Sequence, residues 1–495
     1  MFNFVDNRIS HTLVPLVISY KNLFTIYHII ETKITMRKHL PILFFFFFLT
    51  YGYAQIEISP TLEDAIHKAI EKSSSLKNKD LDIEKLNLQE KGVWNKYIPT
   101  VEASALYTYF DNKLTVDLPT ATIPIVNYPL FDGKTAFKNY GNIFNGSVMA
   151  KTVLFSGMQI PNGAKAVHEK MKGTVFLKES EKDAITKDVI NTFDQLELLK
   201  EIDRLIKESE KRLDTETKRV TKAIEQGLAI PYDRDKIKLA SLELASKKIE
   251  LDGKRKLVYK KIQYLTGYSI TEIENVKYNL TPYLIADEKL STQNKQEIKA
   301  LESFKTAYEY LLKKEKGTYL PTLGAFGGVS YSSLFDANAT TPIITGINEA
   351  LYLGLNEATI SNNWVVGAAM KWEVFSGFER KHKVHEAKIN VEQVQNQIDD
   401  TKEKLELLLE KNLVDYSVLT QKIDITQQQE KVAANNLNLA IKQYKEGLIN
   451  ISERLEAEND SYKASVNKTT TLIEQRLAAI ETIIVTGDLS KKLSK

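Results

Sequence analysis

The sequence predicts a mainly α-helical protein with a small β component, in which long antiparallel helical hairpins are joined to pairs of strands. Three observations predict this class. Glycine and proline are sparse, with 21 and 12 in a chain of 495 residues, so long tracts contain no residue that ends a helix. The chain repeats its own landmarks at one spacing. Short segments of alternating polarity predict strands between the helical tracts.

The duplication is visible in three landmarks that recur 220 residues apart. Phe-Ser-Gly at 155–157 recurs at 375–377, Gly227-Leu228 recurs as Gly447-Leu448, and Gly267 recurs as Gly487. A fourth pair, Tyr-Ile-Pro-Thr at 97–100 and Tyr-Leu-Pro-Thr at 319–322, is separated by 222 residues, which indicates a small length change between repeats. The alternative is chance similarity between charged helical sequences.

Each repeat has the same order of expected elements. The first helices are predicted at 61–95 and 294–316, with Thr61/Asp64 and Asn294/Glu297 as capping pairs. Pro99 and Pro321 end helical structure, and two strands joined by a loop follow. A helical tract of nearly 70 residues then breaks at Gly227 or Gly447 and resumes for about 35 more.

The long tracts carry one narrow apolar stripe each, which is typical of helices that pack side by side. A helix of this length is on the order of 100 Å long. The stripes consist of Ile185, Val189, Phe193, Leu196, Leu199 and Ile202, and of Leu405, Leu409, Leu413, Tyr416, Leu419 and Ile423.

One predicted strand, 363–375, alternates cleanly and places Trp364 and Trp372 on its apolar face. At about 3.3 Å per residue the two rings are roughly 26 Å apart, which is near the height of the apolar band between the aromatic girdles of a membrane barrel. A similar face runs from Val101 to Tyr109. The alternative is a half-buried strand of a soluble sandwich.

Four strands are too few to close a barrel, since the smallest bacterial ones use about eight. Open strand edges cannot face lipid, because their backbone groups have no water to bind. Strands in a membrane must therefore come from several chains. A dimer gives eight strands and a trimer twelve, and an open pore favours a transmembrane β-barrel of twelve strands shared by a trimer.

A secretory signal is predicted at 36–54. A basic head precedes an apolar run with five consecutive phenylalanines, and Gly52 and Ala54 form a small-residue cleavage site. Met36 is therefore the expected start and Gln55 the expected mature N-terminus; a short buried helix is the alternative. The predicted division is 1–54 for leader and signal, 55–268 for the first repeat, 269–291 for a linker, 292–487 for the second repeat and 488–495 for a basic tail.

Composition excludes several functions. There is no cysteine, which excludes disulfides, cysteine-ligated metals and a thiol nucleophile. The net charge of +3 comes without a basic patch that would indicate nucleic acid. His382 and His385 are spaced for a metal on one helix face, but their basic surroundings favour a solvated face. No catalytic constellation and no cofactor motif occur, so the chain is not expected to be an enzyme.

These features together resemble the TolC family of outer-membrane efflux and secretion ducts. The resemblance covers about Thr61 to Gly487 and rests on the doubled layout, the Pro-Thr strand starts, the Phe-Ser-Gly strand ends and the Gly-Leu hairpin turns. It implies a homotrimer in the outer membrane, with a helical tunnel that extends into the periplasm. It also implies a periplasmic adaptor (membrane fusion) protein and an inner-membrane pump of the RND, ABC or MFS type as partners, with outer-membrane lipid around the barrel.

The same resemblance implies a gate at the tips of the hairpins. Glu453 and Glu456, six and nine residues after Gly447, match the acidic gate positions of the family. Asp233 and Tyr444 match a network that ties helices together near the tip, although Ile449 stands where that network has an arginine.

Helix capping is the alternative for these residues. Asn450 and Glu453 fit an N-cap and its third helical position, Asp233 follows Pro231 in a first turn, and Glu456 fits a solvated helix surface. For the whole chain, the alternative function is a periplasmic coiled-coil adaptor or structural protein of an envelope complex.

Overall fold

The computed structural model describes residues 60–123, 128–276, 278–285, 290–341, 349–487 and 489. The predicted signal, the expected N-terminus at Gln55 and most of the basic tail lie outside these residues. No helix in the described ranges has both the length and the apolar character needed to cross a membrane.

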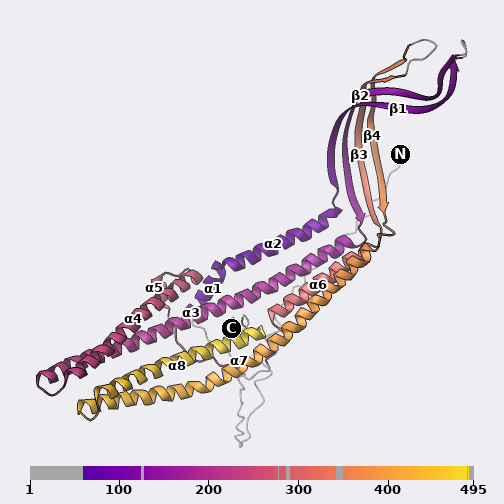
Figure 1. Ribbon diagram of the computed structural model, residues 1–495. Helices are drawn as coiled ribbons and strands as arrows, with labels where there is room; N and C mark the ends of the chain where they lie inside the picture. Colours follow the sequence, from indigo (N-terminus) through magenta and orange to yellow (C-terminus); the bar gives the residue numbers. More distant parts are fainter. Residues whose placement is uncertain are drawn as a thin grey trace, which may run out of the picture. The chain divides into compact units, whose positions relative to one another are not determined.

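The chain consists of two similar halves, each with one strand pair and one long helical hairpin (Figure 1). The first half contains α1 (Pro60–Lys72), α2 (Ser74–Trp94), a 3-10 turn η1 (Asn95–Tyr97), β1 (Thr100–Ile123), β2 (Tyr128–Phe155), α3 (Gln159–Glu225) and α4 (Pro231–Thr266). A short helix α5 (Ile270–Asn275) lies between the halves. The second half contains α6 (Gln296–Gly317), β3 (Thr322–Thr340), β4 (Tyr352–Lys371), α7 (Glu379–Lys445) and α8 (Ile451–Thr486).

The two hairpins match residue for residue. Helices α3 and α7 each have 67 residues, and α4 and α8 each have 36. Left-handed backbone recurs at equivalent glycines, with φ of 73° at Gly227 and 70° at Gly447. The predicted fold class is confirmed: long antiparallel helical hairpins joined to four strands.

Three predicted boundaries were wrong. The first helix is interrupted, because the Ser73 hydroxyl accepts from the Leu76 amide and starts a new helix there. Thr61 lies inside α1, and α6 begins at Gln296 after Lys295, which makes no side-chain cap. The strand expected over 363–375 is β4, which begins earlier and ends at Lys371. Pairing with β3 stops there because Thr322, the first residue of β3, is opposite Lys371.

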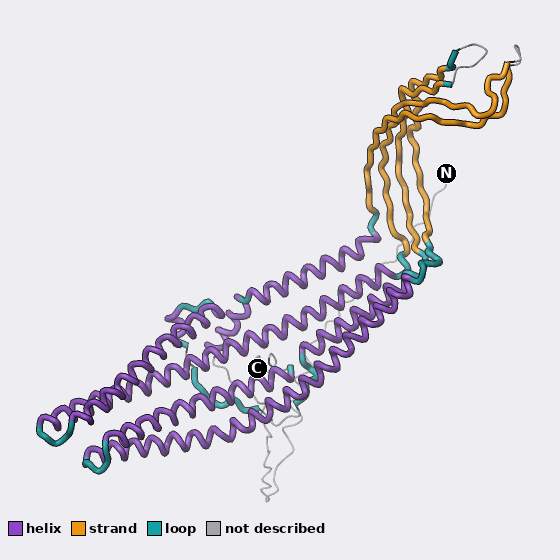
Figure 2. The backbone as a smooth tube through the Cα atoms, in the orientation of Figure 1, coloured by secondary structure: helices purple, strands orange, loops and turns teal. Residues whose placement is uncertain are grey.

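The four strands form one antiparallel sheet in the order β1-β2-β3-β4 (Figure 2). The central pairing of β2 with β3 joins the two halves. Strands β1 and β4 are the edges, and each pairs with one neighbour among the described residues. The edge residues Val101 of β1 and Trp364 of β4 are 68% and 71% exposed.

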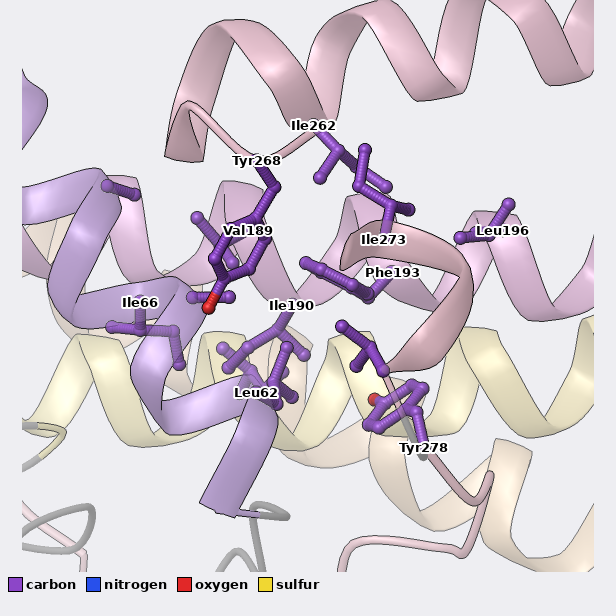
Figure 3. Close-up of a cluster of buried hydrophobic side chains, with 14 of the residues drawn as sticks. Leu62, Ile66, Val189, Ile190, Phe193, Leu196, Ile262, Tyr268, Ile273 and Tyr278 are labelled. Atoms are coloured by element: carbon purple, nitrogen blue, oxygen red, sulfur yellow. The ribbon is translucent and has the colours of Figure 1, made fainter. Parts of the chain in front are cut away.

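The main apolar core lies where α1, α3, α8 and the segment after α4 meet (Figure 3). Val189, Phe193 and Leu196 of the predicted stripe are at most 1% exposed there. Leu62 and Ile66 of α1 pack into the same cluster.

The helical hairpin of α3 and α4 has a second core nearer its turn. Its buried residues are seven apart on both helices, as in a coiled coil: Leu199, Ile206, Leu213 and Val220 on α3, and Ile237, Leu244 and Leu251 on α4.

Candidate functional site

The turns that end the two hairpins are built alike. After α3 the Leu228 amide donates to the Ala223 carbonyl over 2.8 Å, and after α7 the Leu448 amide donates to the Gln443 carbonyl over 2.9 Å. These bonds close the last helical turn around a glycine in the left-handed conformation, which a side chain would strain. Both glycines sit in open space, so the conformation rather than crowding explains them.

The two predicted gate carboxylates lie in the first two turns of α8 and are exposed. Glu453 is also part of the helix cap: its amide donates to Asn450 Oδ1 over 3.0 Å, and Asn450 Nδ2 donates to its carboxylate over 2.5 Å. Capping at Asn450 is therefore present. Because the cap leaves the Glu453 side chain at the surface, it is compatible with a role in a conduit.

An acidic groove runs along the surface between α7 and α8. It has a volume of about 1150 Å³ and its lining includes Glu453, Glu456, Asp460 and Asp424. Within the described ranges, no three ligand side chains are close enough to hold a metal ion. A single chain therefore supplies negative charge here without a closed cation site.

The predicted pair Asp233 and Tyr444 is close in space but shares no hydrogen bond among the described residues. Burial and then the negative charge of Asp233 raise the pKa of Tyr444. The contact that joins the tips comes from Arg219 of α3. Its Nη2 donates over 2.8 Å to the carbonyl of Lys445, at the end of α7, and its guanidinium lies 5.7 Å from the centre of the Tyr444 ring.

Arg219 suits this position because the last carbonyls of a helix have no partner within the helix, and the helix dipole favours a cation there. It supplies a positive charge at the tip, where Ile449 replaces the arginine of the resembling family. Sequence comparison with the family missed it, since Arg219 comes from a different helix.

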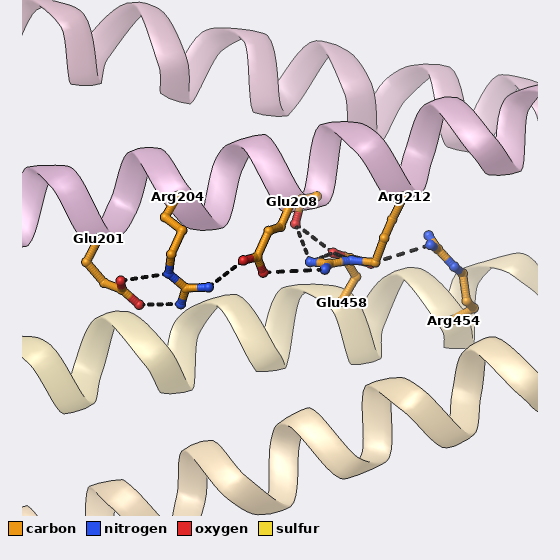
Figure 4. Close-up of polar contacts among 7 residues, drawn as sticks. Glu201, Arg204, Glu208, Arg212, Arg454 and Glu458 are labelled. Atoms are coloured by element: carbon orange, nitrogen blue, oxygen red, sulfur yellow. Dashed lines mark hydrogen bonds and ion pairs between the residues drawn. The ribbon is translucent and has the colours of Figure 1, made fainter.

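A second charged contact crosses from α3 to α8 (Figure 4). Glu458 is 8% exposed and accepts from Ser209 over 2.6 Å and from Arg212 over 2.9 Å. Arg454, 1% exposed, lies 3.4 Å from the other Glu458 oxygen. In contrast, Arg204 pairs with Glu201 and Glu208 on its own helix.

The most buried ion pair lies farther along the same two helices. Nε of Arg476, in α8, donates to both oxygens of Asp194, in α3, over 3.1 Å. The guanidinium also donates to the Thr281 carbonyl over 2.6 Å and to the hydroxyls of Tyr278 and Tyr283. Burial raises the pKa of Asp194, and the Arg476 charge opposes this effect.

The predicted girdle tryptophans are both exposed, Trp364 by 71% and Trp372 by 55%. Trp364 lies within β4, opposite Val329. Trp372 follows the last residue of β4, and its Nε1 donates to the Tyr319 carbonyl over 3.1 Å.

Sequence reasoning missed the charged contacts between α3 and α8 because charged residues on a helix usually lie in water. The signal that could have found them was the duplication itself. Equivalent positions differ in charge: Asp194 corresponds to Val414, and Glu458 to Lys238.

Comparisons with known proteins agree with this architecture. Residues 289–483 match the protein family described as outer membrane efflux protein. No curated protein matches the sequence.

Three solved structures share the fold. They are the CmeC outer membrane channel of Campylobacter jejuni (15% identity, TM-score 0.67, 86% of each chain covered), the outer membrane protein VceC of Vibrio cholerae (12%, 0.63, 86% of this chain and 96% of that one) and the open state of the MtrE outer membrane channel of Neisseria gonorrhoeae (14%, 0.60, 88% and 94%). The predicted resemblance is confirmed.

Proposed function

We propose that this chain, which has the fold of outer-membrane channels and a match to the outer membrane efflux proteins over residues 289–483, is the outer-membrane channel of a tripartite efflux or type I secretion system. It passively conducts substrates that an inner-membrane pump of the RND, ABC or MFS type delivers, across periplasm and outer membrane. A periplasmic adaptor protein joins pump and channel. The channel is a homotrimer, performs no chemistry and needs no cofactor.

The four-stranded sheet with two unpaired edges carries the proposal. Strands β1 and β4 present backbone groups that need partners if lipid surrounds them. Pairing β4 of one chain with β1 of the next satisfies both edges at once, and three chains then close twelve strands. Exposed apolar residues such as Val101, Val366 and Met370 suit a surface in contact with lipid.

The helical hairpins extend the conduit away from the sheet. A helix of 67 residues is about 100 Å long. Three chains supply six hairpins, with the turns at Gly227 and Gly447 at the far end and Glu453 and Glu456 as the proposed acidic ring there. The division of the chain at 268, 291 and 487 remains part of this proposal.

The alternative, a periplasmic coiled-coil adaptor or structural protein, accounts for the hairpins but not for the sheet. It leaves strands of 24 and 28 residues without a function, although about ten residues cross a membrane.

Fractionation separates the two functions. The channel is expected to stay in the outer membrane until detergent releases it, and then to show three chain masses by light scattering. A protein that washes off membranes without detergent, or a monomer that keeps its strand content in detergent, would contradict the channel.

A further inference from the structure

The internal duplication allows the surface of one chain to be compared with its own interior. Helices α3 and α8 pack in antiparallel register, as their cross-contacts show: Lys187 with Glu481, Asp194 with Arg476, and Ser209 with Glu458. We call this contact the inner seam.

The faces of α7 and α4 that are equivalent to the inner seam carry no helix. On α7 the positions equivalent to Lys187, Asp194, Arg212 and Arg219 are all apolar and exposed: Leu407 (69%), Val414 (58%), Val432 (46%) and Leu439 (54%). On α4 the equivalents of Glu458, Arg476 and Glu481 are Lys238, Lys256 and Lys261. We call these two surfaces the outer faces.

Two surfaces of one chain that repeat the two sides of an existing contact are self-complementary between copies. The α7 face of one copy can receive the α4 face of the next in the inner-seam register, which closes a ring of alternating inner and outer seams. The apolar positions of α7 then cover the aliphatic stems of the α4 lysines, whose amines reach water. Ile249, 74% exposed on α4, gains cover as its equivalent Thr469 has, at 9%.

The two seams differ in what separation costs. Parting α3 from α8 strands buried charges, since Asp194, Arg476 and Glu458 lose partners inside the protein. Parting α7 from α4 exposes methyl groups and lysines, and among the described residues Lys238 and Lys256 make no ion pair that would break.

We propose that the outer faces bind each other between copies of this chain, and that the tip of the conduit widens by parting of these outer seams while the inner seams stay paired. This inference rests on the proposed trimeric channel. It assigns the moving contact to α7 and α4, and it makes each chain's two hairpins one unit.

Cross-linking tests the interface directly, because the chain has no cysteine of its own. The pair Lys187→Cys with Glu481→Cys spans the inner seam, and its equivalent, Leu407→Cys with Lys261→Cys, spans the outer seam. In the detergent-solubilised full chain, a short bifunctional methanethiosulfonate reagent should link the first pair within chains. The second pair should yield covalent dimers and trimers on denaturing gels.

A trimer by light scattering in which the outer pair forms no link between chains would overturn the inference and leave the proposed channel standing. A monomer would overturn both. These outcomes separate the two proposals.

Conductance in planar bilayers tests which seam moves. Linking Gln429→Cys to Lys238→Cys across the outer seam near the tip should abolish voltage-driven high-conductance openings, and cleavage of the link by reductant should restore them. The matched control links Glu210→Cys to Lys248→Cys within the first hairpin, where the wild-type side chains are 3.1 Å apart, and should open normally. Unchanged openings of the linked outer pair would show that the tip widens elsewhere.

Discussion

Replacing Arg476 by methionine is expected to loosen the segment between α5 and α6 from the helices. The arginine bonds both carboxylate oxygens of Asp194 and, through the Thr281 carbonyl, holds a segment that has no helix of its own. Met fills similar volume but leaves the buried Asp194 carboxylate and two tyrosine hydroxyls without this partner.

The magnitude follows from burial. Side chains of the pair are 1% and 2% exposed, and breaking a buried pair from one side costs about 3–5 kcal/mol. Since about 1.4 kcal/mol is a factor of ten, local opening should become roughly 10² to 10³ times more frequent.

Hydrogen–deuterium exchange is the assay, because two amides of this segment report on opening. The Tyr283 amide donates to Gln475 over 3.1 Å and the Ile285 amide to the Tyr416 hydroxyl over 3.0 Å. Both should lose protection in Arg476→Met. The double change with Asp194→Leu should recover much of it, because no buried charge is left unpaired.

The control is Lys404→Met, which removes an exposed pair with Asp400 that is worth at most about 1 kcal/mol. If Arg476→Met loses no more protection than this control, the buried pair does not tether the segment, and the reasoning is refuted.

Four further changes have defined outcomes. Burial raises the pKa of Asp183 from 3.8 to about 6; the folded state then holds this proton more tightly than the unfolded state, so thermal stability should fall as pH rises through this window, and Asp183→Asn should remove that fall. Glu453→Gln with Glu456→Gln should abolish block of single-channel current by millimolar divalent cations on the periplasmic side; persistent block would place the acidic ring elsewhere and leave these residues as cap and surface. Arg219→Leu should raise conductance by freeing the tips, whereas Arg204→Leu on the same helix should not; equal conductances would remove Arg219 from the latch. Gly173→Ala should lower the melting temperature, since its Cβ would lie 2.4 Å from the Phe304 ring, at a cost of about 1–3 kcal/mol, while Gly92→Ala, in open space, should raise it slightly; no difference between the two would contradict the packing.

The sequence alone determined the long-range plan, because that plan is written in local chemistry. Gly227 and Gly447 lie at turns that demand left-handed backbone, and the Phe-Ser-Gly tripeptides lie where strands end and helices begin. A heptad-like stripe such as Val189 to Leu199 identifies its own buried face, since apolar burial needs no knowledge of the partner. Helix lengths followed from the absence of breakers between these landmarks.

Tertiary structure decided which charged residues are interior, and this could not be read from one helix at a time. Asp194 and Arg476 are 282 positions apart in the chain, and each looks like ordinary helix surface until α3 and α8 are aligned. The same holds for Arg219, whose partner is a backbone carbonyl and carries no sequence signal. Strand and cap boundaries also moved, because the β3 partner ends β4 at Lys371 and local caps compete within a turn. Local patterns specify elements through near-neighbour energies, whereas the pairing of buried charges depends on which faces meet in space.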